Sequence, residues 1–368
     1  MLTSYNNLLT TKGWKNVAEI EVGDEILTTN FAGHGIFSPV VAVTAKDYNG
    51  YIYDNTDYDF GYRWPCYLSV TEDSKIVRVK KSLRKSVLTG KTYTAQTLER
   101  LTIDDIEYLG IKKIHTLTRS PLQFTEKSSN RNTKLVKDGT ITMKETDYFK
   151  FLAYLTVRGS IVEYHGKLEI AINYRDNLSD LTDLLNNYRV PHRVERKKPN
   201  NGRAHEHYII LMSNNVLAQK TLRPIMKNKL AKREIPKIVV NSKSPESLFA
   251  FIYTYLYLIV SQRSDGMRYS EKLINGMNFM FSPKSEVSSQ ALIDIFFKLG
   301  INATLSNDQS YKKKPIRIAQ SALPWITTES LVKKPYNGKV YAIDTVNELA
   351  VCNPKAQHTH GSMVLQTN

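Results

Sequence analysis

The sequence predicts a multidomain protein in which an all-β domain, formed by both ends of the chain, is split by an α+β domain with an internal duplication. Three observations lead to this fold class. The 368 residues exceed the roughly 250–300 that one hydrophobic core organises. Short apolar runs separated by Gly, Asn and Asp, typical of strands and turns, occupy both ends of the chain. Between them, helical segments alternate with strands in the same order twice.

The N-terminal part of the all-β domain is assigned to residues 1–143. Strands and hairpins are expected over residues 2–79, with a turn at Lys12-Gly13. Residues 48–62 are rich in Asn, Asp and Tyr, which predicts the tip of a long hairpin. The basic stretch 77–94 is interpreted as the exit from this unit, and the polar segment up to Met143 as a connecting region.

The α+β domain is assigned to residues 144–326, with repeats at about 146–243 and 247–325. The first repeat is expected to contain a helix at 149–155, a strand at 167–172, a helix at 178–188 and a strand at 190–194. The second has the same order, at 248–258, 277–281, 288–299 and 300–305. Two long repeats predict two related halves about a pseudo-twofold axis, because a solenoid needs three or more shorter units. The β pattern returns over 327–368, so one domain interrupts the other at a site where loops tolerate insertion.

The composition limits the classes of partner and compartment. Lys and Arg number 51 against 35 Asp and Glu, and the resulting charge of +16 favours a polyanion such as double-stranded DNA. The two cysteines are too few for a disulfide framework or a Cys-ligated zinc site. No stretch reaches the roughly 18 apolar residues of a membrane span, and the start lacks the pattern of a signal peptide. We therefore expect a cytoplasmic monomer without a membrane partner.

Four segments resemble the conserved blocks of inteins, the protein-splicing Hint family. Residues 2–4, 9–14 and 22–27 (LTS, LTTKGW and VGDEIL) resemble the N-terminal block, and residues 68–74 (LSVTEDS) the second block, which ends in Thr-x-x-His. Residues 338–344 (GKVYAID) and 364–368 (VLQTN) resemble the last two blocks. The resemblance implies a horseshoe-like Hint β-fold, host-protein exteins as covalent partners, and no cofactor for splicing.

The resemblance also assigns roles to particular positions. A Cys or Ser at the position of Met1 attacks the preceding carbonyl, while a Thr and a His, here Thr71 and Ser74, polarise and protonate that amide. Asn368 matches the terminal Asn that cyclises to release the intein. Two further positions complete the implied catalytic set. Thr367 stands where a penultimate His is common. Ala342 stands where Asp or Cys is frequent, and Asp344 lies two residues after it.

Methionine at position 1 is the most consequential departure, because a thioether cannot act as the nucleophile. Either an initiating Met replaces a native Cys or Ser, or the element begins differently. The chain as it stands is expected not to splice.

The middle of the chain resembles LAGLIDADG homing endonucleases. Residues 151–161 and 251–261 match the two motif helices, and residues 231–239 (AKREIPKIV) match the segment that precedes a second motif. In that family an acid at the end of each helix holds divalent metal at the scissile phosphates. Here those positions are Arg158 and Ile259, with Asp265 as a possible displaced acid. We expect no metal site and a degenerate nuclease, with Mg²⁺ required only if it is active.

Basic loops occupy equivalent places in the two repeats and are the expected DNA contacts. The candidates are Arg193, Arg196, Lys197, Lys198, Arg203, Lys312, Lys313, Lys314 and Arg317. Two alternatives to the intein remain open. One is a sequence-specific DNA-binding protein descended from a homing endonuclease, and the other is an active endonuclease.

Overall fold

The structure, a computed structural model, describes residues 1–29, 35–57, 67–85, 92–115, 135–138, 141–164, 167–174, 179–197, 206–211, 234–259, 268–283, 287–306, 315–319, 325–346, 349–353 and 363–366. It is a mixed α and β protein with a large antiparallel sheet and several helices. The chain divides into two compact units, Met1–Gln123 with Phe296–Asn368, and Phe124–Ile295. The domain boundaries expected from the sequence, after 143 and before 327, and the assignment of a function to each domain remain predictions.

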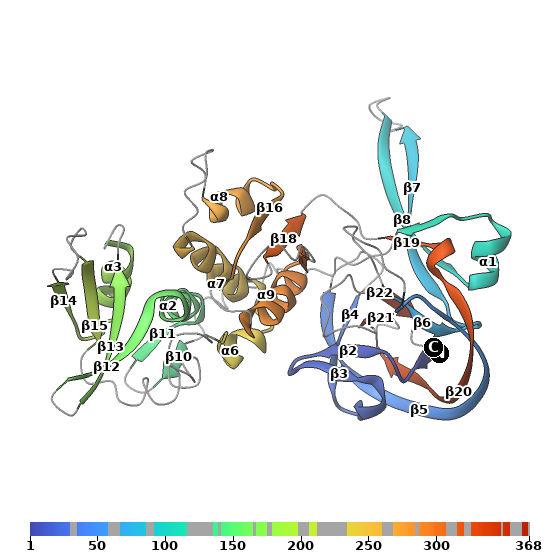
Figure 1. Cartoon of the computed structure of the whole chain (residues 1–368), viewed down its shortest axis with the longest axis horizontal. Coiled ribbons are helices and arrows are strands. Elements are labelled where there is room, and N and C mark those ends of the chain that lie inside the picture. The colour runs from blue at the N-terminus through green and yellow to red at the C-terminus, as the bar shows by residue number, and fades with distance from the viewer. Residues whose placement is uncertain are drawn as a thin grey trace. The chain divides into compact units, whose positions relative to one another are not determined.

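The first unit is built around an eleven-stranded antiparallel sheet (Figure 1). Its main path runs β20-β1-β6-β5-β4-β2-β21-β22-β7-β8, and β3 pairs with β2. The strands are β1 (Leu2–Thr3), β2 (Asn7–Thr10), β3 (Gly13–Asn16), β4 (Glu25–Thr29), β5 (Gly35–Asp54), β6 (Ser69–Thr71), β7 (Ile76–Lys85), β8 (Thr92–Leu101), β20 (Val332–Thr345), β21 (Leu349–Asn353) and β22 (Met363–Gln366). Strands from the two ends of the chain therefore share one sheet.

The longest pairing joins β5 to β20, from Val332 opposite Asp54 to Thr345 opposite Val40. The expected hairpin tip at 48–62 is wrong over residues 48–54, because Gly50 is paired with Tyr336 inside this ladder. Each of two glycines in the ladder lies under the ring of the Tyr two residues before it. A Cβ added to Gly50 would lie 2.8 Å from the Tyr48 ring, and one added to Gly338 would lie 2.9 Å from the Tyr336 hydroxyl. Cross-strand pairing and ring packing thus override two Asn-Gly turn signals.

The segment interpreted as an exit and a connecting region is largely ordered structure. β7 and β8 pair over ten residues and extend as a ribbon from the sheet (Figure 1). A capping box of Thr102 and Asp105 starts α1 (Ile103–Tyr108), whose Ile103 and Ile106 are buried in the core. β9 (Lys113–His115) then pairs with β19 (Trp325–Thr327). The interpretation as a connector is wrong for these residues, because strand pairing satisfies the backbone of a polar segment whose composition resembles a loop.

The core of the first unit lies between the faces of these strands and draws on both ends of the chain. Its members include Leu2, Leu8, Val17, Ile26, Leu68, Val70, Ile76, Ile106, Ile343 and Ala350. Short 3-10 turns, η1 (Val17–Glu19) and η4 (Thr328–Ser330), connect strands at its edge.

The second unit begins with the hairpin β10–β11 (Leu135–Asp138 and Ile141–Lys144). Next come α2 (Glu145–Arg158), β12 (Gly159–Tyr164), β13 (Lys167–Tyr174), α3 (Ser179–Asn187), β14 (His192–Lys197) and β15 (Glu206–Leu211). The four strands form an antiparallel sheet in the order β12-β13-β15-β14. The expected order of helix, strand, helix and strand is confirmed for the first repeat.

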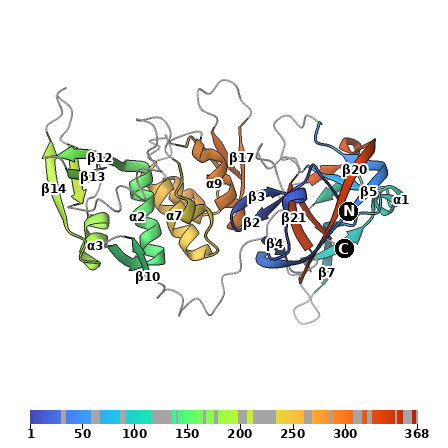
Figure 2. The ribbon, with the colours of Figure 1, turned by 90° about the horizontal axis from the view of Figure 1, so that it is seen from below.

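The second repeat contains α6 (Lys237–Val240), α7 (Pro245–Leu258), α8 (Tyr269–Ile274), β16 (Phe279–Phe281) and α9 (Val287–Lys298), followed by β17 (Asn302–Leu305) and β18 (Ile316–Ala319). Ser244 caps α7, with Pro245 in its first turn. The four expected elements are confirmed, and the division between the two compact units falls within α9. α2 and α7 lie side by side (Figures 1 and 2), and both Ala153 of α2 and Thr254 of α7 are buried.

Candidate functional site

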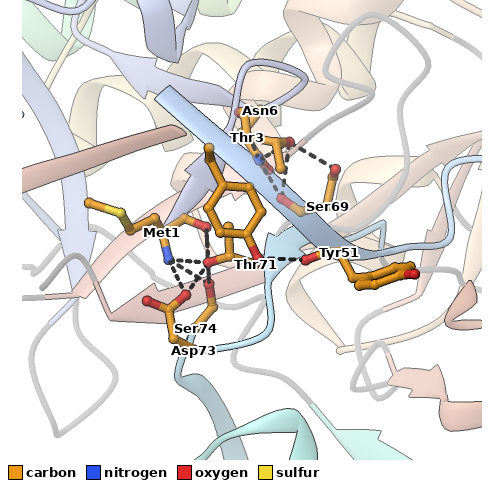
Figure 3. Close-up of polar contacts among 9 residues, drawn as sticks. Met1, Thr3, Asn6, Tyr51, Ser69, Thr71, Asp73 and Ser74 are labelled. Carbon is orange, nitrogen blue, oxygen red and sulfur yellow. Dashed lines mark hydrogen bonds and ion pairs between the residues drawn. The ribbon is translucent and has the colours of Figure 1, made fainter. Parts of the chain in front are cut away.

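The candidate site surrounds the backbone of Met1, where two hydroxyls expected from the sequence meet (Figure 3). The Met1 nitrogen donates to Thr71 Oγ1 at 2.8 Å and to Ser74 Oγ at 2.6 Å. The Met1 carbonyl oxygen accepts from Ser74 Oγ at 3.0 Å, and Thr71 Oγ1 lies 3.3 Å from it. Both polar atoms of the first residue are therefore held by the same two side chains.

The strands position this group. β1 is paired on both sides, with Leu2 opposite Val70 of β6 and opposite Tyr341 of β20. β6 ends at Thr71, whose amide donates to the Met1 carbonyl at 3.3 Å. The chain then turns, and the Ser74 amide donates to the Thr71 carbonyl at 3.1 Å. The turn returns the Ser74 side chain to the end of β1.

A buried polar network next to the site holds β1 against β6. Thr3 Oγ1 and Ser69 Oγ are 2.8 Å apart, and Asn6 Nδ2 donates to the Ser69 carbonyl at 2.6 Å (Figure 3). All three residues are buried. Because a buried polar group without a partner is costly, this network holds β1 in register with β6.

Asp73 is a further residue of this site, which the sequence did not single out. Thr71 Oγ1 donates a short hydrogen bond to Asp73 Oδ1, which also lies 3.6 Å from the Met1 nitrogen. The Asp73 side chain is 68% exposed. Its signal in the sequence was a carboxylate two residues after a threonine in a turn, a spacing that permits a local hydrogen bond.

The charges at the site influence one another. Burial lowers the pKa of the Met1 amine below its ordinary value, although the Asp73 carboxylate opposes this shift, and Lys46 adds to the lowering. Burial alone would raise the pKa of Asp73, but the hydrogen bond from Thr71 and the charge of the Met1 amine outweigh it and hold that pKa below its ordinary value. Asp73 is thus an anion at neutral pH and can accept a proton.

The C-terminal strand lies in the same sheet. β22 pairs with β21 and also with β7, where Leu365 is opposite Ile76, two residues after Ser74. Thr367 and Asn368 lie outside the described residues. Asp344 is on β20 opposite Ala42, next to a register shift, and within the described ranges no hydrogen bond or ion pair joins it to Met1.

In the second unit, the residue at the acid position of the first motif makes a contact between helices. Arg158 Nη2 donates to the carbonyl of Leu258, the last residue of α7, at 3.1 Å. Ile259 is the C-cap of α7, and Asp265 lies outside the described residues. Among the residues that the structure describes, no group of three or more His, Cys, Asp or Glu could hold a metal ion. No described helix is long and apolar enough to cross a membrane.

The expected DNA contacts belong to two antiparallel strand pairs, β14–β15 and β17–β18, and to the segments that join the strands of each pair. Arg193 on β14 pairs with Glu195 at 2.8 Å, and Arg317 is half-buried on β18. The side chains of Arg196 and Lys197 lie outside the described part of the chain. The same holds for the whole of Lys198, Arg203, Lys312, Lys313 and Lys314.

No known protein-domain family and no curated protein matches the chain. It is similar to solved structures of homing endonucleases. Mesophilic variants of the homing endonuclease I-DmoI share 10% identity and a TM-score of 0.30, over 48% of this chain and 89% of that one. I-DmoI in complex with DNA and Mn shares 10% identity and a TM-score of 0.30, over 48% and 90%. The homing endonuclease I-WcaI bound to its DNA recognition sequence shares 11% identity and a TM-score of 0.32, over 54% and 83%.

Proposed function

We propose that this chain is an intein, a self-excising protein-splicing element whose Hint domain is formed by both ends of the chain. The observation that carries the proposal is the contact of Thr71 and Ser74 with both the nitrogen and the carbonyl oxygen of Met1. In a precursor, that nitrogen would belong to the amide linking the host protein to residue 1. Hydrogen-bond donors at this amide are what an acyl shift needs, because they stabilise charge on the scissile group and protonate the departing nitrogen.

The remaining steps assign roles to residues at both ends. A Cys or Ser in place of Met1 would attack the preceding carbonyl carbon, and the acyl group would pass to a residue after Asn368. Cyclisation of Asn368 would then release the element. The pairing of β22 with β7 supports a role for both ends, because Leu365 of the last strand is opposite Ile76, two residues after Ser74. We assign no cofactor to these steps.

The test restores the missing parts. Met1→Cys, with several host residues on each side and Cys, Ser or Thr after Asn368, is expected to yield ligated host product and free element. Mass spectrometry identifies both. The matched control is the same precursor with Met1 retained, which should remain intact because a thioether cannot form the thioester. A folded Met1→Cys precursor that neither cleaves nor ligates, with or without Ser74→His, would show that splicing is ancestry only.

The residues between the Hint segments are proposed to bind double-stranded DNA as a degenerate LAGLIDADG-type domain. The observation that favours binding over cutting concerns Arg158, which stands where the family has a metal-binding acid. Its guanidinium donates to the Leu258 carbonyl. Metal ions of this kind require oxygen ligands, which neither Arg158 nor the Ile259 side chain supplies. The basic loops joining β14 to β15 and β17 to β18 are the proposed phosphate and base contacts. We also propose that the excised protein is a cytoplasmic monomer.

A further inference from the structure

The site around Met1 contains a hydroxyl where splicing elements have an imidazole, and a hydroxyl alone is a poor acid and base at neutral pH. Ser74 can orient the amide through its two contacts with Met1, but it cannot hold a proton while a bond breaks. If the proposed reaction runs in this chain, another group must do so. The charged side chains that act on the Met1 amine are Asp73 and Lys46, and Glu72 is the neighbouring carboxylate of the same turn.

The contacts distinguish Asp73 from the other two. Lys46 is cationic and disfavours a charged amine at Met1, so it cannot serve as the base. Glu72 is engaged elsewhere, because its carboxylate pairs with Lys333 Nζ at 2.5 Å. Asp73 accepts directly from Thr71 Oγ1, which itself accepts from the Met1 nitrogen at 2.8 Å. A hydrogen-bonded chain therefore connects the reacting nitrogen to one carboxylate.

We propose that Asp73, acting through the Thr71 hydroxyl, replaces the missing imidazole as the proton relay of the acyl shift. This inference rests on the proposed function. Thr71 touches the reacting nitrogen and is the catalytic residue, whereas Asp73 is a positioning and proton-holding residue behind it. Ser74 retains the task of orienting the amide.

The proton balance of the step is complete without another reagent. With Met1→Cys, the introduced thiol adds to the carbonyl carbon of the preceding residue and its proton passes to the exposed Asp73 carboxylate through water. As the carbon–nitrogen bond breaks, Asp73 returns a proton to Thr71 Oγ1 while the Thr71 hydroxyl proton moves to the departing nitrogen. The products are a thioester and a free amine.

Exposure makes a purely structural role for Asp73 inadequate. Its side chain is 68% exposed, and exposed ion pairs contribute little to stability. The buried Thr71 hydroxyl that donates to it also lies 3.0 Å from Ser74 Oγ and 3.3 Å from the Met1 carbonyl oxygen, so it keeps other partners when the carboxylate is removed. The same exposure lets the carboxylate exchange protons with water, which a relay requires. Asp73→Asn therefore tests chemistry with little effect on folding.

The experiment uses the full precursor carrying Met1→Cys and measures the rate of thiol-induced cleavage at the N-terminal junction. Asp73→Asn is expected to slow cleavage about 100-fold, the size of a lost acid–base contribution. Asp73→Glu should recover most of the rate. Glu72→Gln, which removes the neighbouring carboxylate of the same turn, is the matched control and should keep the parent rate. Thermal unfolding of each variant establishes that the fold is retained.

Repeating the Asp73→Asn measurement in a precursor that also carries Ser74→His separates a relay from a structural role. In Ser74→His precursors an imidazole holds the proton, so Asp73→Asn is expected to slow cleavage less than about threefold. Equal slowing in both backgrounds would overturn the relay. If the Ser74 precursor is inert and the Ser74→His precursor cleaves, the relay is overturned while the proposed function stands. If both are folded and inert, the proposed function fails, and the relay fails with it.

Discussion

The guanidinium of Arg158 is predicted to stabilise the end of α7. The last four carbonyls of a helix lack partners within it, and Leu258 is the final residue of α7. The 3.1 Å hydrogen bond from Arg158 Nη2 satisfies that carbonyl and places a cation at the negative end of the helix. Arg158 is itself the last residue of α2, so this one contact joins the ends of two helices.

The magnitude follows from the type of contact. A hydrogen bond from a charged donor contributes about 1.5–3 kcal/mol, and partial exposure of Arg158 favours the lower part of this range. We therefore expect Arg158→Gln to cost about 1.5–2 kcal/mol, which increases the population of locally open states roughly 10- to 30-fold. Arg158→Asp should cost about 1 kcal/mol more, because it adds an anion to the negative end of α7.

Hydrogen exchange measured by mass spectrometry is the suitable assay, because a chain with two compact units does not unfold in one transition. Peptides from α2 and α7 should exchange faster in Arg158→Gln, while peptides from β5 and β20 remain unchanged. Lys150→Gln is the matched control, since it removes an exposed cation of α2 whose ion pair, with Asp147, lies within that helix. Unchanged exchange of α7 in Arg158→Gln would refute the capping argument, as would slower exchange in Arg158→Asp without added metal.

Three further predictions concern the middle of the chain. Changing four basic residues to Ala, namely Lys197, Lys198, Lys312 and Lys313, should weaken DNA binding and make its salt dependence shallower. Titration from low to physiological salt measures both effects. An unchanged slope would mean that these residues are solvent-exposed charges only. The unaltered chain should not cut DNA with Mg²⁺ in a nicking assay, because the two acid positions lack oxygen ligands. The double variant Arg158→Asp with Ile259→Asp is expected to restore nicking or cleavage. Metal-dependent double-strand cleavage by the unaltered chain would contradict this prediction and implicate Asp265. Tyr188→Phe should cost about 1–1.5 kcal/mol at pH 7 through loss of its 2.7 Å hydrogen bond to Asp147. Burial alone would raise the pKa of Asp147, but the hydrogen bonds from Tyr188 and Lys150 outweigh it and lower that pKa overall. The stability from this contact is therefore lost as pH falls below about 4. Denaturant unfolding, followed by hydrogen exchange of peptides from the second unit, should show a smaller effect of Tyr188→Phe at pH 3 than at pH 7.

The repeated helices show what local pattern can predict. The apolar periodicity of residues 149–155 and 248–258 located α2 and α7, and Ser244 with Pro245 marks where α7 begins. Thr71 and Ser74 were singled out by their order and spacing within a short block, and both contact Met1. These features could be predicted because each depends on residues close together in the sequence.

The errors arose where distant pairing outweighs local preference. Asn49-Gly50 has the signature of a tight turn, yet it lies within β5 because β20 pairs along the whole strand and the Tyr48 ring covers the glycine. The polar segment after residue 77 looked like a connector, yet β8 pairs with β7 over ten residues. Strand formation depends on what lies opposite, and composition does not report that.

By itself, the sequence determined the alternation of β-rich ends with a helical repeat and the positive charge. It also determined which side chains stand at positions 1, 71 and 74, and that positions 158 and 259 have no acid. Only the tertiary structure decided that Asp73 joins the hydroxyls at Met1, and that the Arg158 guanidinium is directed at the end of α7. The contacts that define these sites span separations of 70 to 100 residues along the chain. Such contacts depend on sheet register and on helix packing. In a strand, a shift of one residue turns a side chain to the opposite face of the sheet.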